Sequence, residues 1–120
     1  MADQKIILLV ENSRTALAAL TIQLEEAGYL VDGVRLGAEA ILKAKEKAYS
    51  AIIMDIFMPQ MNGYEAAKHI RDLGVTTPIF ALTASQDPRD KKTCLESGMN
   101  AFLAKSEDQK ELFETLKNIL

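Results

Sequence analysis

The sequence has very little cysteine and no long apolar run. Cys94 is the one cysteine in 120 residues, which excludes an internal disulfide and a zinc site built on several cysteines and is typical of a reducing compartment. Apolar runs such as those at 6–10 and 51–54 are far shorter than the ~20 residues of a bilayer span, and residues 1–4 lack the basic and apolar regions of a secretory signal. We therefore expect a cytoplasmic protein without a membrane partner.

Positive charge is also in short supply. The chain holds 14 Lys and Arg against 17 Asp and Glu, for a net charge of -3, so it lacks the basic surface with which proteins bind nucleic acids. Its length and its 48% of hydrophobic residues are those of one globular domain with one core. We expect a single domain over residues 1–120 with no direct nucleic-acid contact. The Met1 start and the end at Leu120 without a linker favour a free-standing protein.

Short apolar runs alternate with stretches of helical periodicity, as expected for βα units around a parallel sheet. Several runs are almost continuous in apolar residues, which is typical of strands covered on both faces. The sequence therefore predicts an α/β fold with helices on both sides of the sheet. The predicted strands are residues 6–10, 30–34, 51–54, 79–82 and 101–103.

Apolar residues three or four positions apart predict the buried faces of the helices between the strands. The predicted core positions include Leu20, Leu24, Ala44 and Leu73. The helix over residues 88–97 is the weakest, because only Cys94 and Leu95 are plausible core contacts. Asp87 and Ser106 are expected to begin helices, and the Asn62–Gly63 pair predicts a tight turn. Helix ends in the left-handed conformation are predicted at Gly28, Gly74 and Gly98.

Four polar residues lie just past the ends of predicted strands: Glu11, Asp55, Thr83 and Lys105. The carboxyl ends of parallel strands meet at one edge of the sheet, so these side chains should converge there. Two neighbouring carboxylates repel each other, and Mg²⁺ relieves this repulsion through oxygen ligation. A carboxylate can also accept a phosphoryl group. We therefore predict that Asp55 is the phosphoacceptor, with a cation at Glu11 and with Lys105 and the Thr83 hydroxyl on the phosphate.

The sequence resembles the receiver domains of two-component response regulators over essentially its whole length. The resemblance implies a flavodoxin-like, doubly wound (βα)5 domain with a five-stranded parallel sheet in the order 2-1-3-4-5. It also implies that Asp55 is phosphorylated from a phosphohistidine on a histidine kinase or a histidine phosphotransfer protein. The motifs that carry the resemblance are Ile-Leu-Leu-Val-Glu-Asn at 7–12, Met-Asp-Ile-Phe-Met-Pro-Gln-Met-Asn-Gly at 54–63, Ala-Leu-Thr-Ala at 81–84 and Phe-Leu-Ala-Lys at 102–105.

Individual roles follow from the same resemblance. It implies that Glu11, Asp55 and the Phe57 carbonyl bind Mg²⁺. It further implies that Thr83 and Phe102 form a coupled switch that changes the surface of the 88–97 helix, the last strand and the last helix. An unidentified downstream protein would bind that surface.

Two positions depart from the family. Relatives usually carry two acids where this chain has Glu11 and Asn12, so we count Asn12 among the metal ligands, direct or through water, but expect weaker Mg²⁺ binding. Ser106 stands where proline commonly follows the lysine, often in a cis peptide. Because a cis bond costs ~3 kcal/mol without proline, we expect a trans bond between Lys105 and Ser106.

Parts of the sequence are also compatible with other functions. The loss of an acid at Asn12 leaves open a phosphorylation-independent pseudo-receiver that serves only as an interaction module. Glu11 and Lys105 could also form a simple surface ion pair. A phosphatase or a flavin-binding electron carrier is disfavoured, because no second acid follows two residues after Asp55 and the loop at 12–15 has no glycine. We expect no enzyme activity beyond slow autodephosphorylation.

Overall fold

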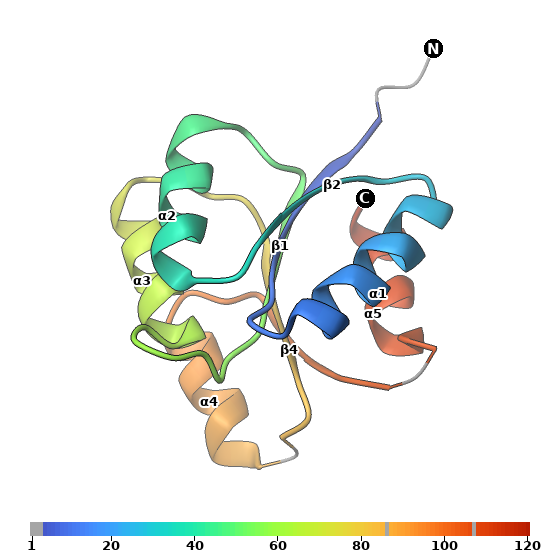
Figure 1. The fold of residues 1–120 in the computed structure, drawn as a ribbon. Helices are drawn as coiled ribbons and strands as arrows, with labels where there is room; N and C mark the ends of the chain where they lie inside the picture. The colour runs from blue at the N-terminus through green and yellow to red at the C-terminus, as the bar shows by residue number, and fades with distance from the viewer. Residues whose placement is uncertain (1–3, 86, 107) are drawn as a thin grey trace.

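The computed structural model describes residues 4–85, 87–106 and 108–120, and these form a twisted parallel sheet covered by helices on both faces (Figure 1). The five strands lie in the order β2-β1-β3-β4-β5, so the doubly wound, flavodoxin-like fold was predicted correctly. The strands are β1 (Ile6–Val10), β2 (Leu30–Val34), β3 (Ala51–Met54), β4 (Ile79–Thr83) and β5 (Ala101–Ala104).

The three central strands are almost wholly buried because helices cover both of their faces. This burial explains the continuous apolar sequences of β1, β3 and β4, which have no solvent side to carry polar residues. Strand β2 is at the edge of the sheet and has the mixed sequence Leu-Val-Asp-Gly-Val, with only Val34 fully buried. The observed β4 and β5 each extend one residue beyond the prediction, so Thr83 is the last residue of β4.

Two separate cores lie on the two faces of the sheet. Helices α1 and α5 cover one face, and α2, α3 and α4 cover the other (Figure 1). Leu24 and Leu112 belong to the first core, and Ile70 and Cys94 to the second. The sheet therefore separates the two layers of helices. The helices are α1 (Arg14–Glu26), α2 (Gly37–Glu46), α3 (Gly63–Asp72), α4 (Pro88–Glu96) and α5 (Lys110–Ile119).

The predicted helical faces are largely buried, with exceptions near the helix ends. Leu20, Leu24 and Ala44 are in the core as predicted. Leu95 and Leu73 were wrongly expected there, since they are 50% and 45% exposed. Leu95 lies in the last turn of α4 and Leu73 is the C-cap of α3, so each is close to the end of its helix.

Most of the predicted helix ends are confirmed. Gly28, Gly74 and Gly98 have φ values of 99°, 86° and 95°, in the left-handed region where glycine is favoured. Asp87 caps α4 by accepting a hydrogen bond from the Arg89 amide. The predicted start at Ser106 is wrong.

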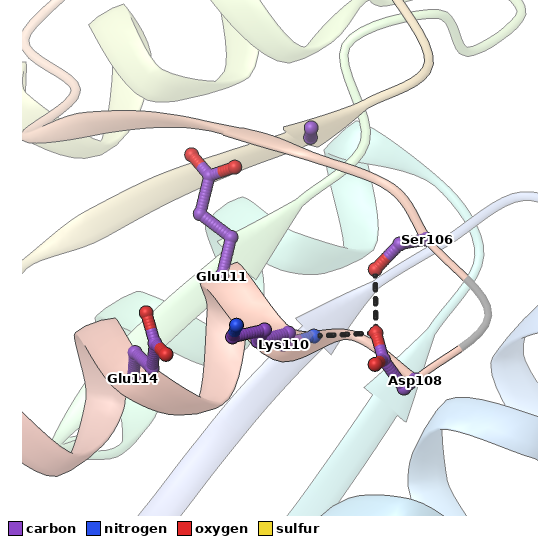
Figure 2. Close-up of a pocket in the computed structure, with 6 residues that line it drawn as sticks. Ser106, Asp108, Lys110, Glu111 and Glu114 are labelled. Carbon is purple, nitrogen blue, oxygen red and sulfur yellow. Dashed lines mark hydrogen bonds between the residues drawn. The ribbon is translucent and has the colours of Figure 1, made fainter.

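Helix α5 begins at Lys110, one turn later than expected. Figure 2 shows the reason: the Asp108 carboxylate lies between the Ser106 hydroxyl and the Lys110 amide, and both donate to its Oδ1 at 3.1 Å. Gln109 then enters the helix in the left-handed conformation, with φ 51°. A charged acceptor close to the first helical amide thus replaces the hydroxyl cap that the sequence suggested.

The segment between β3 and α3 folds tightly against itself, but not as the simple turn predicted. Asn62 is the N-cap of α3 and forms a capping box with Glu65. Gly63 is the first helical residue, and its amide donates to the Ile56 carbonyl at 2.8 Å. A Cβ atom on Gly63 would lie 2.5 Å from the Asp55 carbonyl oxygen. Glycine is therefore required here by close approach of the backbone.

The described residues contain no cis peptide bond. The Lys105–Ser106 bond is thus trans, as predicted. Within the same residues, no helix has both the length and the apolar character needed to cross a membrane.

Candidate functional site

Three side chains predicted from the strand ends meet at the carboxyl edge of the sheet. Lys105 Nζ donates to Glu11 Oε1 at 2.9 Å and lies 3.7 Å from Asp55 Oδ2. The carboxyl groups of Glu11 and Asp55 are close enough to share a hydrogen bond. These residues follow β1, β3 and β5, so the order of the strands brings distant parts of the chain together.

Asp55 is held firmly and is nearly buried. Its amide donates to the Val10 carbonyl at 2.9 Å, which continues the pairing of β3 with β1 past the end of the strand. Its Oδ1 accepts a hydrogen bond from the Phe57 amide at 3.3 Å. The other oxygen, Oδ2, is the one nearest Lys105. The two oxygens of Asp55 therefore have different surroundings.

The two acids share one small volume, and their proton affinities differ as a result. Burial, together with the adjacent Glu11 carboxylate, raises the pKa of Asp55 to about 6. Burial opposes ionisation of Glu11 as well, but hydrogen bonds from Asp55 and Lys105 and the Lys105 charge outweigh it and lower the pKa of Glu11. Glu11 is therefore the more readily ionised acid of the pair.

Thr83 is fully buried at the end of β4, and its hydroxyl is already engaged. Thr83 Oγ1 accepts a hydrogen bond from the Ser85 amide at 3.1 Å. Ser85 in turn donates through its own hydroxyl to the Asp90 carboxylate in the first turn of α4. The Thr83 hydroxyl is thus linked to α4 through one residue.

Phe102, the other half of the predicted switch pair, is partly buried in β5. It packs against the core under α2, α3 and α4. In the β4–β5 register Ala81 is opposite Phe102 and Thr83 is opposite Ala104, so Thr83 and Phe102 side chains project from the same face of the sheet. The structure places the pair on one face, and its switch role stays a prediction.

Asn12 is directed toward the end of β2. Its Nδ2 donates to the Arg35 carbonyl at 3.3 Å, and Arg35 Nε donates to the Asn12 carbonyl at 3.0 Å. Phe57, whose carbonyl was predicted to bind the cation, lies two residues beyond Asp55 with its side chain 61% exposed. Both residues belong to loops that border the Glu11–Asp55 pair.

The residues present fit a small divalent cation. Asp55 and Glu11 bring two carboxyl groups together at the bottom of the site, where burial and the neighbouring Glu11 carboxylate raise the pKa of Asp55. A hard cation ligated by oxygen removes such repulsion. Among the described residues no group of three or more His, Cys, Asp or Glu could hold a metal. A cation here would therefore need carbonyl, amide or water oxygens in addition to the two acids.

Sequence reasoning missed Arg35 and Ser85. Arg35 follows the end of β2 directly, as Glu11 follows β1 and Asp55 follows β3, so the rule that found the acids would also have found it. Ser85 had no such signal, because its role depends on the path of the chain between β4 and α4.

A separate hollow of about 390 Å³ lies beside the start of α5 (Figure 2). Acids including Glu111 and Glu114 line it, and neither Glu11 nor Asp55 is among its lining residues.

The fold and the site together define a class of protein: a doubly wound α/β domain with an acid pair and a lysine at the carboxyl edge of its sheet. The response regulator receiver domain family matches residues 7–117. The chain belongs to this family, the phosphoacceptor domains of two-component signal transduction, which confirms the resemblance seen in the sequence.

The relatives are receiver domains inside larger proteins and as separate structures. The chain is 38% identical over 112 residues to the hybrid signal transduction histidine kinase B of Dictyostelium discoideum, a match that covers 82% of this chain and 6% of the kinase. It is 36% identical, with a TM-score of 0.88, to the receiver domain of the sensor histidine kinase PA1611 of Pseudomonas aeruginosa, and the match covers 98% of both chains. That structure has a magnesium ion coordinated in its active-site cleft.

A second solved structure is the response regulator TrrA of Thermotoga maritima in complex with Mg²⁺ and BeF. The identity is 32% and the TM-score 0.89, and the match covers 98% of this chain and all of that one. Magnesium binding is thus found in the family.

Proposed function

We propose that this domain accepts a phosphoryl group on Asp55 from a phosphohistidine of a histidine kinase or a histidine phosphotransfer protein. The observation that carries the proposal is the meeting of Asp55, Glu11 and Lys105, with Lys105 Nζ 2.9 Å from one acid and 3.7 Å from the other. Asp55 offers a nucleophile, Glu11 a carboxylate that can bind a cation, and Lys105 a fixed positive charge. Phosphoryl transfer to a carboxylate requires these three parts.

The transfer step is a substitution at phosphorus. An Asp55 oxygen bonds to phosphorus while the P–N bond to the donor imidazole breaks, and the imidazole keeps the electron pair and takes up a proton. Oδ2 is the better candidate for the attack, because Oδ1 accepts the Phe57 amide and is held by it. Lys105 lies on the Oδ2 side, where it can neutralise the phosphoryl oxygens.

Glu11, Asp55 and the Phe57 carbonyl are the proposed Mg²⁺ ligands, with the Asn12 amide oxygen direct or through water. The ion supplies positive charge for the phosphoryl group as it arrives. Lys105 is paired with Glu11 before phosphorylation. It therefore exchanges a carboxylate partner for a phosphoryl partner when Asp55 is modified.

Phosphorylation is proposed to act on the surface through Thr83. The Thr83 hydroxyl leaves the Ser85 amide and donates to the phosphoryl group, and Phe102 moves inward on the same face of the sheet. The effect is a shift between two populations, limited by the difference in free energy with which the phosphoryl group interacts with each. The changed surface of α4, β5 and α5 is the proposed binding site of an unidentified output protein.

The domain is proposed to act as a switch in the cytoplasm and not as an enzyme, apart from slow loss of its own phosphoryl group. Direct contact with nucleic acid or membrane forms no part of the proposal. The net charge of -3 supports this view.

The test is intact mass after incubation with a small-molecule phosphodonor, with and without Mg²⁺, for the parent and Asp55→Asn. We expect one added phosphoryl group in the parent with Mg²⁺, and none in Asp55→Asn or without Mg²⁺. Absence of the added mass at every Mg²⁺ concentration would refute the proposal and favour the phosphorylation-independent pseudo-receiver.

A further inference from the structure

Asn12 and Arg35 join the two loops that follow β1 and β2. The Asn12 side chain donates to the main chain of Arg35, and the Arg35 side chain donates to the main chain of Asn12. Both bonds are partly buried. These two reciprocal hydrogen bonds fix the two loops relative to each other beside Glu11 and Asp55.

The position of Arg35 is itself fixed from several sides. Its amide donates to the side chain of Glu39 in the first turn of α2 at 3.3 Å. The preceding residue, Val34, is buried in the core and accepts the Glu11 amide at 3.0 Å. The Arg35 carbonyl is therefore a stable reference point beside Glu11.

The direction of the Asn12 bond has a chemical consequence. An amide side chain has one end that donates, Nδ2, and one that accepts, Oδ1, and only oxygen ligates a hard cation. A carbonyl accepts hydrogen bonds, so it accommodates Nδ2 and repels Oδ1. The hydrogen bond to the Arg35 carbonyl thus engages Nδ2, which cannot ligate a cation, and leaves Oδ1 available as a ligand.

We infer that Arg35 is a positioning residue for the cation site: its side chain holds the Asn12 backbone so that the Arg35 carbonyl keeps the Asn12 amide oriented with its oxygen available to Mg²⁺. The inference rests on the proposed function, because it concerns the same cation. It gives the cation site a neutral third side-chain ligand in place of a third carboxylate. Residues that orient metal ligands commonly change metal affinity by about 10- to 100-fold when removed.

The experiment measures Mg²⁺ affinity of the unphosphorylated protein by NMR titration for the parent, Arg35→Lys, Asn12→Ala and the double variant. Lysine keeps the positive charge but lacks the Nε donor in the guanidinium plane. We expect Arg35→Lys to weaken Mg²⁺ binding about tenfold in the parent background, and to have no further effect in the Asn12→Ala background. The Asn12 side-chain NH₂ resonances should also exchange faster with solvent in Arg35→Lys.

Arg71→Lys is the matched control. Arg71 also donates to main-chain carbonyls, those of Gly98, Val75 and Thr77, but it does so at the opposite edge of the sheet. It should lower thermal stability and leave Mg²⁺ affinity unchanged.

The possible results distinguish failure of this inference from failure of the proposed function. Equal Mg²⁺ affinity in the parent and Arg35→Lys overturns the inference, and so does an equal loss with and without the Asn12 amide. Either result leaves the proposed function intact, provided that the parent binds Mg²⁺ and takes up the phosphoryl group. A parent that binds no Mg²⁺ overturns both.

Discussion

Asp55 carries its charge at a cost to the folded state. Its raised pKa means that ionisation is less favourable in the folded protein than in the unfolded chain, where the pKa is near 4. The penalty is absent below about pH 4, grows as the pH rises toward about 6 and is constant above it. Burial and the neighbouring Glu11 carboxylate thus make the charge of Asp55 unfavourable, and a bound cation can relieve this cost.

Replacing Asp55 by asparagine should therefore stabilise the metal-free protein. The amide keeps an oxygen that can accept the Phe57 amide but brings no charge. We expect the free energy of unfolding at pH 7 to rise by about 1–2 kcal/mol, and the gain to disappear near pH 4. Urea unfolding at the two pH values measures it. Asp72→Asn, at an exposed position, is the control and should change stability by less than about 0.5 kcal/mol. A destabilised Asp55→Asn at pH 7 would contradict the prediction.

The amide of Asn12 sets the charge of the cation site. Asn12→Asp adds a carboxylate, loses the donor to the Arg35 carbonyl and so turns away from it. We expect Mg²⁺ to bind about tenfold more tightly to Asn12→Asp than to the parent, because charge adds to oxygen ligation. The titration of the two proteins side by side is the measurement, and equal affinities would show that the missing acid is of no consequence.

The connection between β3 and α3 depends on the close packing of Gly63 against the backbone of residues 55 and 56. Gly63→Ala puts a methyl group into the backbone of residues 55 and 56, at 2.5 Å from an oxygen and 2.9 Å from a carbon. We expect a loss of about 2–3 kcal/mol in the free energy of unfolding and displacement of Asp55. Chemical denaturation and the Mg²⁺ titration give the two readouts.

Gly37→Ala is the matched control, since Gly37 also occupies the first position of its helix. The nearest atoms to its Cβ belong to the flexible Met61 side chain and to the Ala66 Cβ, at 3.2–3.3 Å. This substitution should cost much less, because Met61 can shift and alanine favours the helix. Equal losses at Gly63 and Gly37 would mean that backbone crowding is not the cause.

At the level of elements, contacts between residues close in the sequence could be predicted, whereas contacts that depend on how distant segments meet could not. Asp87 was a recognisable cap because its partner is two residues away. The start of α5 was misplaced since the choice between Ser106 and Asp108 depends on how the chain leaves β5. The convergence of Glu11, Asp55 and Lys105 could be predicted from strand ends alone, whereas the orientation of Asn12 could not, because its partner lies 23 residues away.

Acidification should lower the stability of the whole molecule by weakening the hydrogen bond between Tyr49 and Asp32. Tyr49 joins the α2–β3 connection to the edge strand, where its hydroxyl donates to Asp32 Oδ2 at 2.7 Å. This bond and the one from Lys47 lower the pKa of Asp32. A lowered carboxyl pKa contributes stability that is fully present above the unfolded value near 4 and is lost as the pH falls through the folded value.

Tyr49→Phe should therefore destabilise the protein by about 1 kcal/mol at pH 7, and the difference from the parent should shrink as the pH falls from 4 toward 3 and below. Urea unfolding across this range is the measurement. Tyr29→Phe, which alters a tyrosine packed against the core under α1 and α5, serves as the comparison and should show no such narrowing. A difference independent of pH would assign the effect to packing instead of to the Asp32 carboxylate.

The contact between Lys105 and Glu11 spans 94 positions of the chain. During synthesis the two acids emerge from the ribosome well before the lysine does, and a nascent chain that stops short of β5 has the carboxylates without the ammonium that neutralises them. Competence for phosphorylation is therefore acquired only after β5 and Lys105 have been synthesised. A truncated product should remain silent in signalling even where its phosphoacceptor is present.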